Sequence, residues 1–266
     1  MNEVVVEHPV KPGAEAFYAP GDGARAGTAL ALIHGITGSP ISLRPLAERL
    51  AAHGFRIEAP RLPGHGTSER DMARTRYSDW VAAAHATVER LSNQADRVVL
   101  VGLSMGGAMS LDIAASERHP KLAGVVSINA QILDRQRLAL KLGPVLERVL
   151  PLAPAALAGL RKDDIAKPGV SEHAYGWMPT AAGNSFTREL PRIREGLARV
   201  RCPVLVVYSR QDHSVDPENS RALLGMLPAE TTTELVLERS YHVATLDYDL
   251  ELIEQNVVGF VSGFGA

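Results

Sequence analysis

The chain has 266 residues, of which 45% are hydrophobic, and its formal net charge is −2 at pH 7. This length suits one large α/β domain, and the balanced charge excludes the charged blocks of proteins that bind nucleic acid or anionic membranes. The single cysteine, Cys202, excludes an internal disulfide. Because it precedes an apolar run, we expect a buried core residue, with a reactive thiol as the less favoured alternative.

Targeting and metal signals are absent from the sequence. No apolar run approaches the ~18 residues of a membrane span, and residues 1–8 lack the basic head and apolar core of a secretory signal. We therefore expect a cytoplasmic protein. The nine histidines do not pair with each other or with the cysteine at ligand spacing, so we expect neither a metal nor another cofactor.

Strand and helix patterns alternate through the first half of the chain. Short apolar runs predict strands at residues 3–6, 14–18, 28–33, 55–59, 97–101 and 122–128. Helical spacing predicts helices at residues 43–50, 78–91 and 107–115. In the second of these, Ser78 is a plausible cap, and the expected buried side holds Trp80, Ala84, Thr87, Val88 and Leu91. The alternation predicts a parallel sheet with helices on both faces.

Two glycine-rich loops follow strands in this region. The first spans His34–Pro40 and the second spans Arg61–Ser68. Both fall at the carboxyl edge of the expected sheet, where main-chain N–H groups can face a ligand. Taken alone, either loop could be a plain connection between a strand and a helix. His65 is isolated among turn-forming residues, so we interpret it as a hydrogen-bonding loop residue rather than a catalytic group.

The run from Gly102 to Gly106 has the form Gly-x-Ser-x-Gly, with Ser104 at its centre. An apolar strand precedes it and a helix follows it, which is the context of a nucleophile elbow. Such a turn strains the serine backbone, and a Cβ at either glycine would collide with the neighbouring strand or helix. The sequence therefore predicts that Ser104 is a nucleophile whose oxygen is lifted clear of the sheet.

The strand–helix alternation stops between residues 129 and 190. Leucines and valines recur at helical spacing over 138–150, and several prolines follow. An insertion of this length is expected to form a lid or cap that lines an acyl pocket, although its apolar helix could instead pack on the core. We therefore expect a core of parallel sheet and flanking helices at residues 1–128 and 191–266 and a cap at 129–190.

The regular pattern resumes with helices at residues 188–199, 217–227 and 248–260 and strands at 203–208 and 233–237. Asp212 and His242 each follow one of these strands. A serine nucleophile needs a base, and that base needs a buried acid. The order Ser104, Asp212, His242 suits this chemistry. Asp216 is the weaker acid candidate, because it precedes a proline and suits a helix cap.

Two further aspartates and two main-chain groups complete the constellation. Asp247 and Asp249 are expected to be structural, since carboxylates complement the dipole at the start of the last helix. The oxyanion of a tetrahedral intermediate needs two N–H donors. We expect them from Met105, at the start of the helix after Ser104, and from Ile36 in the first glycine-rich loop.

Four stretches resemble the α/β-hydrolase fold and, within it, the bacterial monoacylglycerol lipases and their carboxylesterase relatives. They are His34–Pro40, Pro60–Thr67, Gly102–Gly107 and Ser240–Asp249. The resemblance implies a serine hydrolase for medium- and long-chain monoacylglycerols. It implies Ser104, Asp212 and His242 as the triad, with Ile36 and Met105 as oxyanion donors.

The resemblance also assigns Asn129 and Glu172 to the polar residues that orient the glycerol end of the substrate. The chain departs from the family at Ile36, where phenylalanine is usual, and over residues 131–165, where the match is poorest. We therefore expect an unusual acyl pocket. Transient contact of the cap with lipid surfaces is a further expectation, and no nucleic-acid partner is expected.

Other reactions use the same residues. A broad carboxylesterase, an acyltransferase, a thioesterase and a carbon–carbon bond hydrolase remain alternatives, because function depends on the site and not on the fold. A ligand receptor on a hydrolase scaffold is disfavoured, because every element of the catalytic machinery is present in the sequence.

Overall fold

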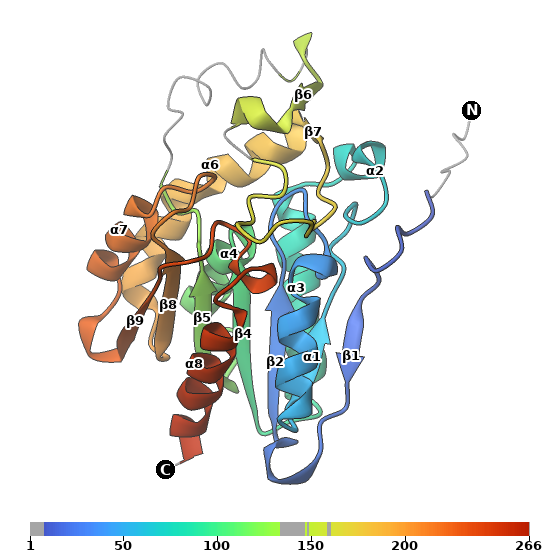
Figure 1. Cartoon of the computed structure of the whole chain (residues 1–266). Coiled ribbons are helices and arrows are strands. Elements are labelled where there is room, and N and C mark those ends of the chain that lie inside the picture. The colour runs from blue at the N-terminus through green and yellow to red at the C-terminus, as the bar shows by residue number, and fades with distance from the viewer. Residues whose placement is uncertain (1–7, 134–146, 148, 159–160, 266) are drawn as a thin grey trace.

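A computed structural model describes residues 8–133, 147, 149–158 and 161–265. Its centre is a seven-stranded sheet of order β1-β3-β2-β4-β5-β8-β9 (Figure 1). All neighbouring strands pair in parallel except β1, which is antiparallel to β3. The strands are β1 (Phe17–Ala19), β2 (Thr28–Ile33), β3 (Arg56–Ala59), β4 (Arg97–Leu103), β5 (Leu122–Ile128), β8 (Val204–Ser209) and β9 (Thr232–Leu237). The expected parallel sheet is confirmed.

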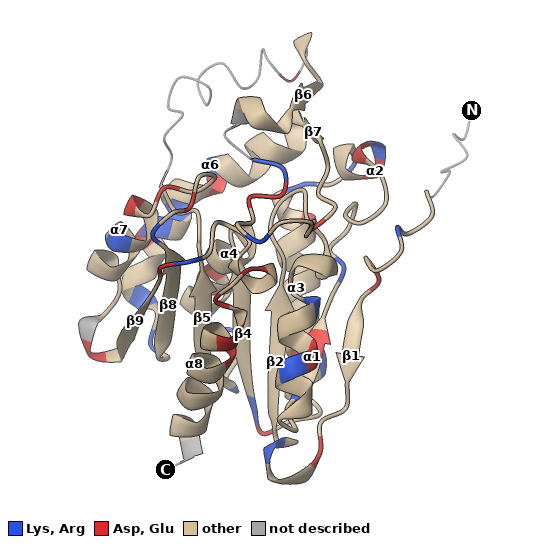
Figure 2. Cartoon of the chain, viewed as in Figure 1, with Lys and Arg blue, Asp and Glu red and all other residues tan. Residues whose placement is uncertain are grey.

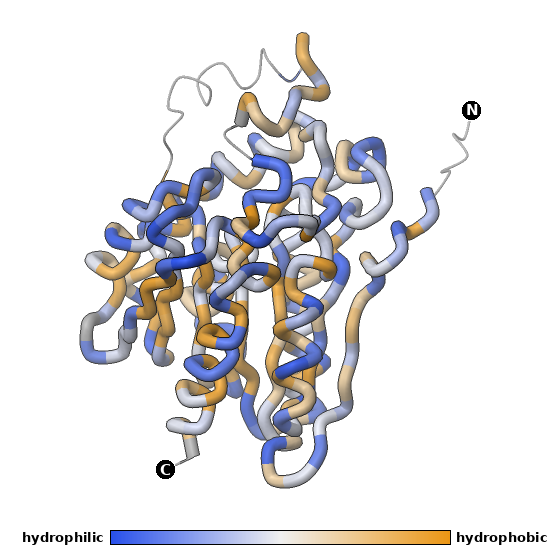
Figure 3. The backbone as a smooth tube through the Cα atoms, in the orientation of Figure 1, coloured by the Kyte–Doolittle hydropathy of each residue, from blue (hydrophilic) through white to orange (hydrophobic). Residues whose placement is uncertain are grey.

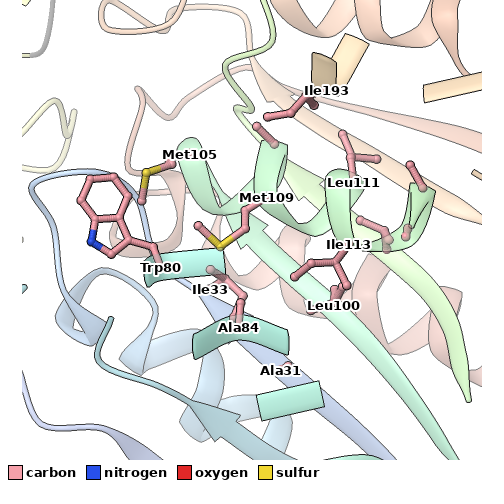
Figure 4. Packing of buried hydrophobic residues seen from close by; sticks show 14 of the residues in the cluster. Ala31, Ile33, Trp80, Ala84, Leu100, Met105, Met109, Leu111, Ile113 and Ile193 are labelled. Carbon is pink, nitrogen blue, oxygen red and sulfur yellow. The ribbon is translucent and has the colours of Figure 1, made fainter. Parts of the chain in front are cut away.

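Helices cover both faces of this sheet. They are α1 (Arg44–Ala52), α2 (Glu69–Ala73), α3 (Tyr77–Ser92), α4 (Met105–Ala115), α6 (Thr180–Gly196), α7 (Glu218–Met226) and α8 (Leu250–Ser262). Alternate residues of β2 join opposite clusters. Leu30 and Leu32 pack with α1 and α8. Ala31 and Ile33 pack with α3 and α4, as Figure 4 shows. Because both faces are buried, the central strands β2, β5 and β8 contain no charged residue. The charged residues lie mainly in helices and loops (Figures 2 and 3), with a few on β3, the start of β4 and β9.

Most predicted elements are confirmed within one to four residues at their ends, and the exceptions have local causes. Helix α3 begins at Tyr77, and its cap is Arg76, whose N–H donates to Asp79 Oδ2 at 2.8 Å. The prediction of Ser78 as the cap is therefore wrong. The residues expected on the buried side of α3 are all buried. The short helix α2 is an element that periodicity did not reveal.

Helix α6 begins at Thr180, eight residues before the predicted start. Thr180, Gly183 and Asn184 are poor helix formers, so propensity hides this first half. Packing overrides propensity, because Ala182, Phe186, Leu190 and Ile193 recur at helical spacing and are buried. Helix α6 also crosses the residue 190 boundary proposed between cap and core.

The rest of the insertion contains a small hairpin. Strands β6 (Leu152–Pro154) and β7 (Trp177–Pro179) pair antiparallel, away from the central sheet (Figure 1). Residues 161–175 between them run as irregular backbone. The predicted strand at 3–6 and most of the helical pattern at 138–150 lie outside the described residues.

The order of the strands reverses direction between β2 and β4. The chain steps from β2 to β3 on one side and from β4 to β5 on the other. Ligands bind at such a reversal, outside the carboxyl ends of the strands. The loop from His34 and the turn at Ser104 both begin there, so the fold brings together the two stretches that sequence analysis singled out.

Helix α4 lies against this reversal at very short range. A Cβ on Gly102 would lie 2.1 Å from the Gly106 carbonyl oxygen, and a Cβ on Gly106 would lie 2.0 Å from the Ile33 carbonyl oxygen. Both contacts are with backbone, which cannot move aside as a flexible side chain could. The expected collisions are thus confirmed.

We predict that Gly106→Ala lowers the free energy of unfolding by roughly 3 kcal/mol or more, or prevents folding, because the overpacking is against main chain. The matched control is Gly259→Ala in α8, where a Cβ would meet nothing within 4 Å. That change should stabilise the protein by about 1 kcal/mol through helix propensity. Urea unfolding measures both, and equal stabilities for the two variants would contradict the close approach.

Candidate active site

Ser104 occupies the tight turn between β4 and α4. Its backbone angles are φ 57° and ψ −119°, a conformation that non-glycine residues rarely adopt. The Ser104 N–H donates to the Ile128 carbonyl oxygen at 2.8 Å, which ties the turn to the end of β5. The residue is 3% exposed. The strain therefore persists because two neighbouring strands and a helix enforce it.

Asp212 and His242 form a buried pair at the same sheet edge. His242 Nδ1 lies 2.7 Å from Asp212 Oδ2. Asp212 Oδ1 accepts from the N–H groups of Ser214 and Val215 at 2.8 and 2.7 Å. With one oxygen held by the main chain, the other is aimed at the imidazole. The pair can therefore fix one tautomer of His242 with Nε2 as the free base.

No hydrogen bond joins the Ser104 hydroxyl to His242 among the described residues. Catalytic hydrogen bonds are often long in unliganded enzymes and tighten only in the substrate complex. The two residues are nevertheless linked through the end of β5. Ser104 binds the carbonyl of Ile128, and the next residue, Asn129, donates from Nδ2 to the His242 carbonyl oxygen at 2.7 Å.

The charges around His242 favour its protonated form. Burial alone lowers the pKa of His242, but the charge and hydrogen bond of Asp212, together with Glu172 and Asp164, outweigh burial. The net pKa of His242 is therefore raised above its usual 6.5.

Two main-chain N–H groups are available near Ser104. Within the described part of the chain, the N–H groups of Ile36 and Met105 donate no hydrogen bond to protein. Ile36 is 9% exposed and Met105 is fully buried. Buried N–H groups without a partner are rare in native proteins, and Met105 begins α4, where the helix dipole favours an anion. The pair can thus bind an oxyanion.

His34 supports the loop that carries Ile36. Its Nε2 accepts from the Leu62 N–H at 3.2 Å, so Nδ1 carries the proton and donates to the Gly35 carbonyl oxygen at 2.9 Å. Burial and the nearby His65 lower the pKa of His34 to about 3. A neutral imidazole therefore joins the two glycine-rich loops across the whole working pH range.

His65 has the loop role expected of it. Its Nδ1 lies 3.0 Å from the Pro63 carbonyl oxygen, and its ring packs edge-on against His34 and Trp80. Burial lowers the pKa of His65 to about 4. Pro217 rather than Asp216 is the N-cap residue of α7, but Asp216 Oδ1 accepts from the Glu218 N–H, the first of the helix, at 2.7 Å.

Asn129 and Glu172 are the expected substrate contacts, and they differ in which of their polar side-chain atoms are already hydrogen-bonded to protein. Asn129 Oδ1 accepts from the Ser209 N–H at 2.7 Å, while its Nδ2 donates to the His242 carbonyl. A substrate hydroxyl would have to compete with these bonds. Glu172 donates its backbone N–H to Asp163, and the described residues place no hydrogen bond on its carboxyl.

The Glu172 carboxyl faces the first glycine-rich loop. Its Oε2 would lie 3.1 Å from a Cβ on Gly38. Burial, partly offset by His242 and reinforced by Asp163 and Asp164, raises the pKa of Glu172 to about 7. The group is therefore close to half ionised at neutral pH and can accept or donate a hydrogen bond.

Sequence reasoning missed the polar contacts that fasten residues 163–175 to the catalytic loops. The Tyr175 N–H donates to the Thr37 carbonyl oxygen at 3.0 Å, and the Tyr175 hydroxyl accepts from the Thr67 N–H at 2.8 Å. Asp247 accepts from the N–H groups of Ala166, Lys167 and Tyr241. Asp247 is thus structural, but it binds two loops rather than complementing a helix dipole.

Neither a metal site nor a membrane span is evident in the described part of the chain. No group of three or more histidine, cysteine, aspartate or glutamate side chains there could hold a metal ion. No described helix is both long and apolar enough to cross a bilayer. Cys202 packs against the core, and burial raises its pKa to about 11.

Known proteins that are similar to this chain in sequence and structure include several hydrolases. The family described as serine aminopeptidase, S33, matches residues 24–249. A thermostable monoacylglycerol lipase from Bacillus sp. (strain H-257) is 38% identical over 257 residues, which cover 96% of each chain. A carboxylesterase from Bacillus subtilis (strain 168) is 24% identical over 237 residues, 88% of this chain and 92% of that protein.

A solved structure from work on LipS and LipT, two metagenome-derived lipolytic enzymes, has the same fold. Its TM-score is 0.87 at 35% identity, and the match covers 96% of this chain and 100% of the other. With the family match, this likeness confirms the expected α/β-hydrolase fold.

We predict that kcat/KM falls as pH drops, with a midpoint above 6.5, because the raised pKa of His242 leaves less free base at neutral pH. Because the pKa of His242 is raised in the folded protein, the Asp212–His242 pair also contributes to the free energy of unfolding. This contribution is complete below pH 6.5 and is lost as pH rises through the pKa of His242. A kcat/KM profile from pH 5 to 9 measures the midpoint. A midpoint below 6.5 would contradict this electrostatic account.

Proposed function

The chain belongs to the serine aminopeptidase S33 family of serine hydrolases, and from this premise we propose that it hydrolyses monoacylglycerols with medium or long acyl chains. The observation that carries the proposal is the 38% identity, over 96% of both chains, to a protein named as a monoacylglycerol lipase. Ser104, Asp212 and His242 are proposed as the triad, with the N–H groups of Ile36 and Met105 as oxyanion donors.

The first half of the reaction forms an acyl-enzyme. His242 Nε2 takes the proton of the Ser104 hydroxyl as the oxygen attacks the ester carbonyl, and Asp212 stabilises the resulting imidazolium. The two N–H donors bind the carbonyl oxygen as it becomes negative. Each such donor typically contributes about 3 kcal/mol to transition-state stabilisation. His242 then gives its proton to the leaving glycerol oxygen.

The second half reverses these roles with water. His242 takes a proton from water, the hydroxide attacks the acyl carbonyl, and the same N–H groups hold the second oxyanion. The proton then returns to Ser104 as the fatty acid leaves. No cofactor enters either half-reaction.

The polar end of the substrate is assigned to Glu172. Its carboxyl is free of protein partners among the described residues and faces the loop that carries Ile36. A glycerol hydroxyl could donate to the ionised carboxylate or accept from the protonated acid. Asn129 is proposed to orient the glycerol mainly by fixing His242, because its amide already binds the His242 carbonyl.

The insertion at residues 129–190 is proposed as a cap over a core of residues 1–128 and 191–266. Apolar side chains are exposed around its hairpin, at Val149, Leu150, Leu152, Leu157 and Trp177. The hairpin lies at the upper edge of the molecule in Figure 3, where several backbone segments are coloured as hydrophobic. We place the enzyme in the cytoplasm and propose that this edge makes transient contact with lipid surfaces, where monoacylglycerols reside.

A broad carboxylesterase is the second candidate. It is favoured by the likeness to a carboxylesterase across 88% of the chain. The two functions differ in whether the glycerol end of the ester contributes to the transition state.

We predict that Ser104→Ala abolishes hydrolysis and labelling by a fluorophosphonate, because both need the serine oxygen. For the parent enzyme, kcat/KM should rise with acyl length and should be higher for monoacylglycerols than for methyl esters of the same acid. An acyl-thioester and an aminoacyl anilide serve as comparison substrates. Equal rates for the glycerol and methyl esters would favour the carboxylesterase, and residual turnover in Ser104→Ala would reject the triad.

We predict that Glu172→Gln lowers the ratio of kcat/KM for a monoacylglycerol to kcat/KM for its methyl ester by roughly tenfold, as expected for one lost hydrogen bond to a charged group. The matched control is Glu58→Gln, since Glu58 pairs with Arg90 away from the site. An unchanged ratio in Glu172→Gln would remove Glu172 from substrate binding.

We predict that Leu157→Ser weakens binding to phosphatidylcholine vesicles by roughly tenfold, the effect of losing one buried leucine side chain. Leu157 is 69% exposed. The control is Leu252→Ser on α8, where the leucine is 38% exposed on another face. Cosedimentation with vesicles measures both, and equal binding by the two variants would exclude the hairpin as the contact surface.

A further inference from the structure

Asp164, in the insertion, is a buried residue that forms a second aspartate–histidine pair, with the exposed His213, beside the proposed triad. Asp164 Oδ1 lies 2.8 Å from His213 Nδ1, and Oδ2 accepts from the His213 N–H at 3.0 Å and from the Ser214 hydroxyl at 3.3 Å. Asp164 is 5% exposed. His213 and Ser214 directly follow Asp212, so these bonds fix the loop that carries the acid.

Asp164 also binds the loop that carries His242. Its main-chain carbonyl oxygen accepts from the Val243 N–H at 3.1 Å. The His213 ring packs edge-on against Tyr241, with 4.4 Å between centroids. Asp164 thus contacts the residue after the acid and the residue after the histidine directly, and it reaches the residue before the histidine through the His213 ring.

Before Asp212, the two catalytic loops are joined by hydrogen bonds from Ser209 Oγ to the Tyr241 carbonyl oxygen and from Gln211 Nε2 to the Glu238 carbonyl oxygen, both at 2.7 Å. The two N–H groups that orient the Asp212 carboxylate belong to Ser214 and Val215, in the same stretch that Asp164 grips. Asn129 holds the His242 carbonyl from the opposite side, through β5. Asp164 therefore adds, in one residue, a link between the stretch directly after Asp212 and the residue directly after His242.

We propose that Asp164, acting with His213, is a positioning residue that sets the geometry of the Asp212–His242 hydrogen bond. This proposal rests on the triad assigned under the proposed function. It makes part of the insertion a fixed support of the catalytic loops. Asp164 touches no reacting atom and acts through its neighbours.

Charge gives the proposal a signature that a merely structural role would lack. The charged groups that face His242 are Asp212, Glu172 and Asp164, and each raises its pKa. Asp163 and Asp164 also face Glu172, so a change at Asp164 alters Glu172 as well. The charge of Asp164 is therefore best tested in a Glu172→Gln background, where Glu172 cannot titrate.

The first experiment observes the hydrogen bond without substrate. The proton between Asp212 and His242 should give a strongly deshielded NMR signal in the parent, and Asp164→Ala should broaden or remove it. In steady-state assays with a methyl ester, kcat should fall by about 10²-fold, the usual effect of misplacing a catalytic group by about 1 Å. KM should change by less than about threefold, because ground-state binding does not use this bond.

The second experiment uses Asp164→Asn, which keeps the size and one acceptor oxygen but loses the charge. In the Glu172→Gln background, kcat should fall less than in Asp164→Ala, and the acid limb of the kcat/KM profile should move to lower pH. The matched control is Asp112→Asn. Asp112 is also a well-buried aspartate, paired with Arg192 at 2.8 Å, but it lies on α4 away from these loops. The Asp112→Asn change should lower the free energy of unfolding and leave the acid limb of the kcat/KM profile at its parental pH.

Clear outcomes would overturn the proposal. A folded Asp164→Ala variant with the parental NMR signal and kcat would do so, as would an unmoved acid limb in Asp164→Asn. If Asp164→Ala does not fold, His213→Ala removes the side-chain contact, and parental kcat in that variant has the same force. Failure of the proposed function is distinguishable, because turnover by Ser104→Ala would reject the triad while the NMR result would still report the hydrogen bond.

Discussion

Helix α4 approaches β2 and β4 more closely than any side chain would allow, and the active site depends on this contact. Gly102 and Gly106 leave no room for a Cβ, so the chain must turn within the few residues between them. That turn forces Ser104 into a positive φ and leaves the first N–H of α4 unpaired. One packing constraint thus produces both the raised serine and half of the proposed oxyanion site, with the strain offset by the buried sheet around it.

The remaining groups are held by polar contacts in addition to the apolar packing of their loops. Loops at a sheet edge bury little hydrophobic surface, so their positions depend on hydrogen bonds that are costly to leave unmade. Asp164, Asp247 and Tyr175 supply such bonds from or to the insertion. The irregular segment at 163–175 and the loops at the sheet edge therefore hold each other in position.

The sequence predicted the sheet and the placement of Ser104, Asp212 and His242 because each signal is local. Continuous apolar runs identify strands, and chain order brings loops after parallel strands to one edge. The early start of α6 and the Arg76 cap of α3 were not predictable, since burial outweighed propensity in one and a backbone contact replaced a serine in the other. The contacts of Asp164 and Tyr175 join residues far apart in the chain and leave no periodic pattern.

The insertion combines two kinds of sequence, and this division explains which part of the function can be derived. Residues 163–175 are polar, contact the catalytic loops and bear on the chemistry of the triad. The hairpin of β6 and β7 exposes apolar side chains such as Leu157 and Trp177. It bears on which lipid surfaces and acyl chains the enzyme contacts. Catalytic geometry is constrained by hydrogen bonds with fixed partners, whereas an apolar surface accepts many volumes and shapes. The reaction class therefore follows from a few residues, while the preferred acyl chain depends on many weak contacts.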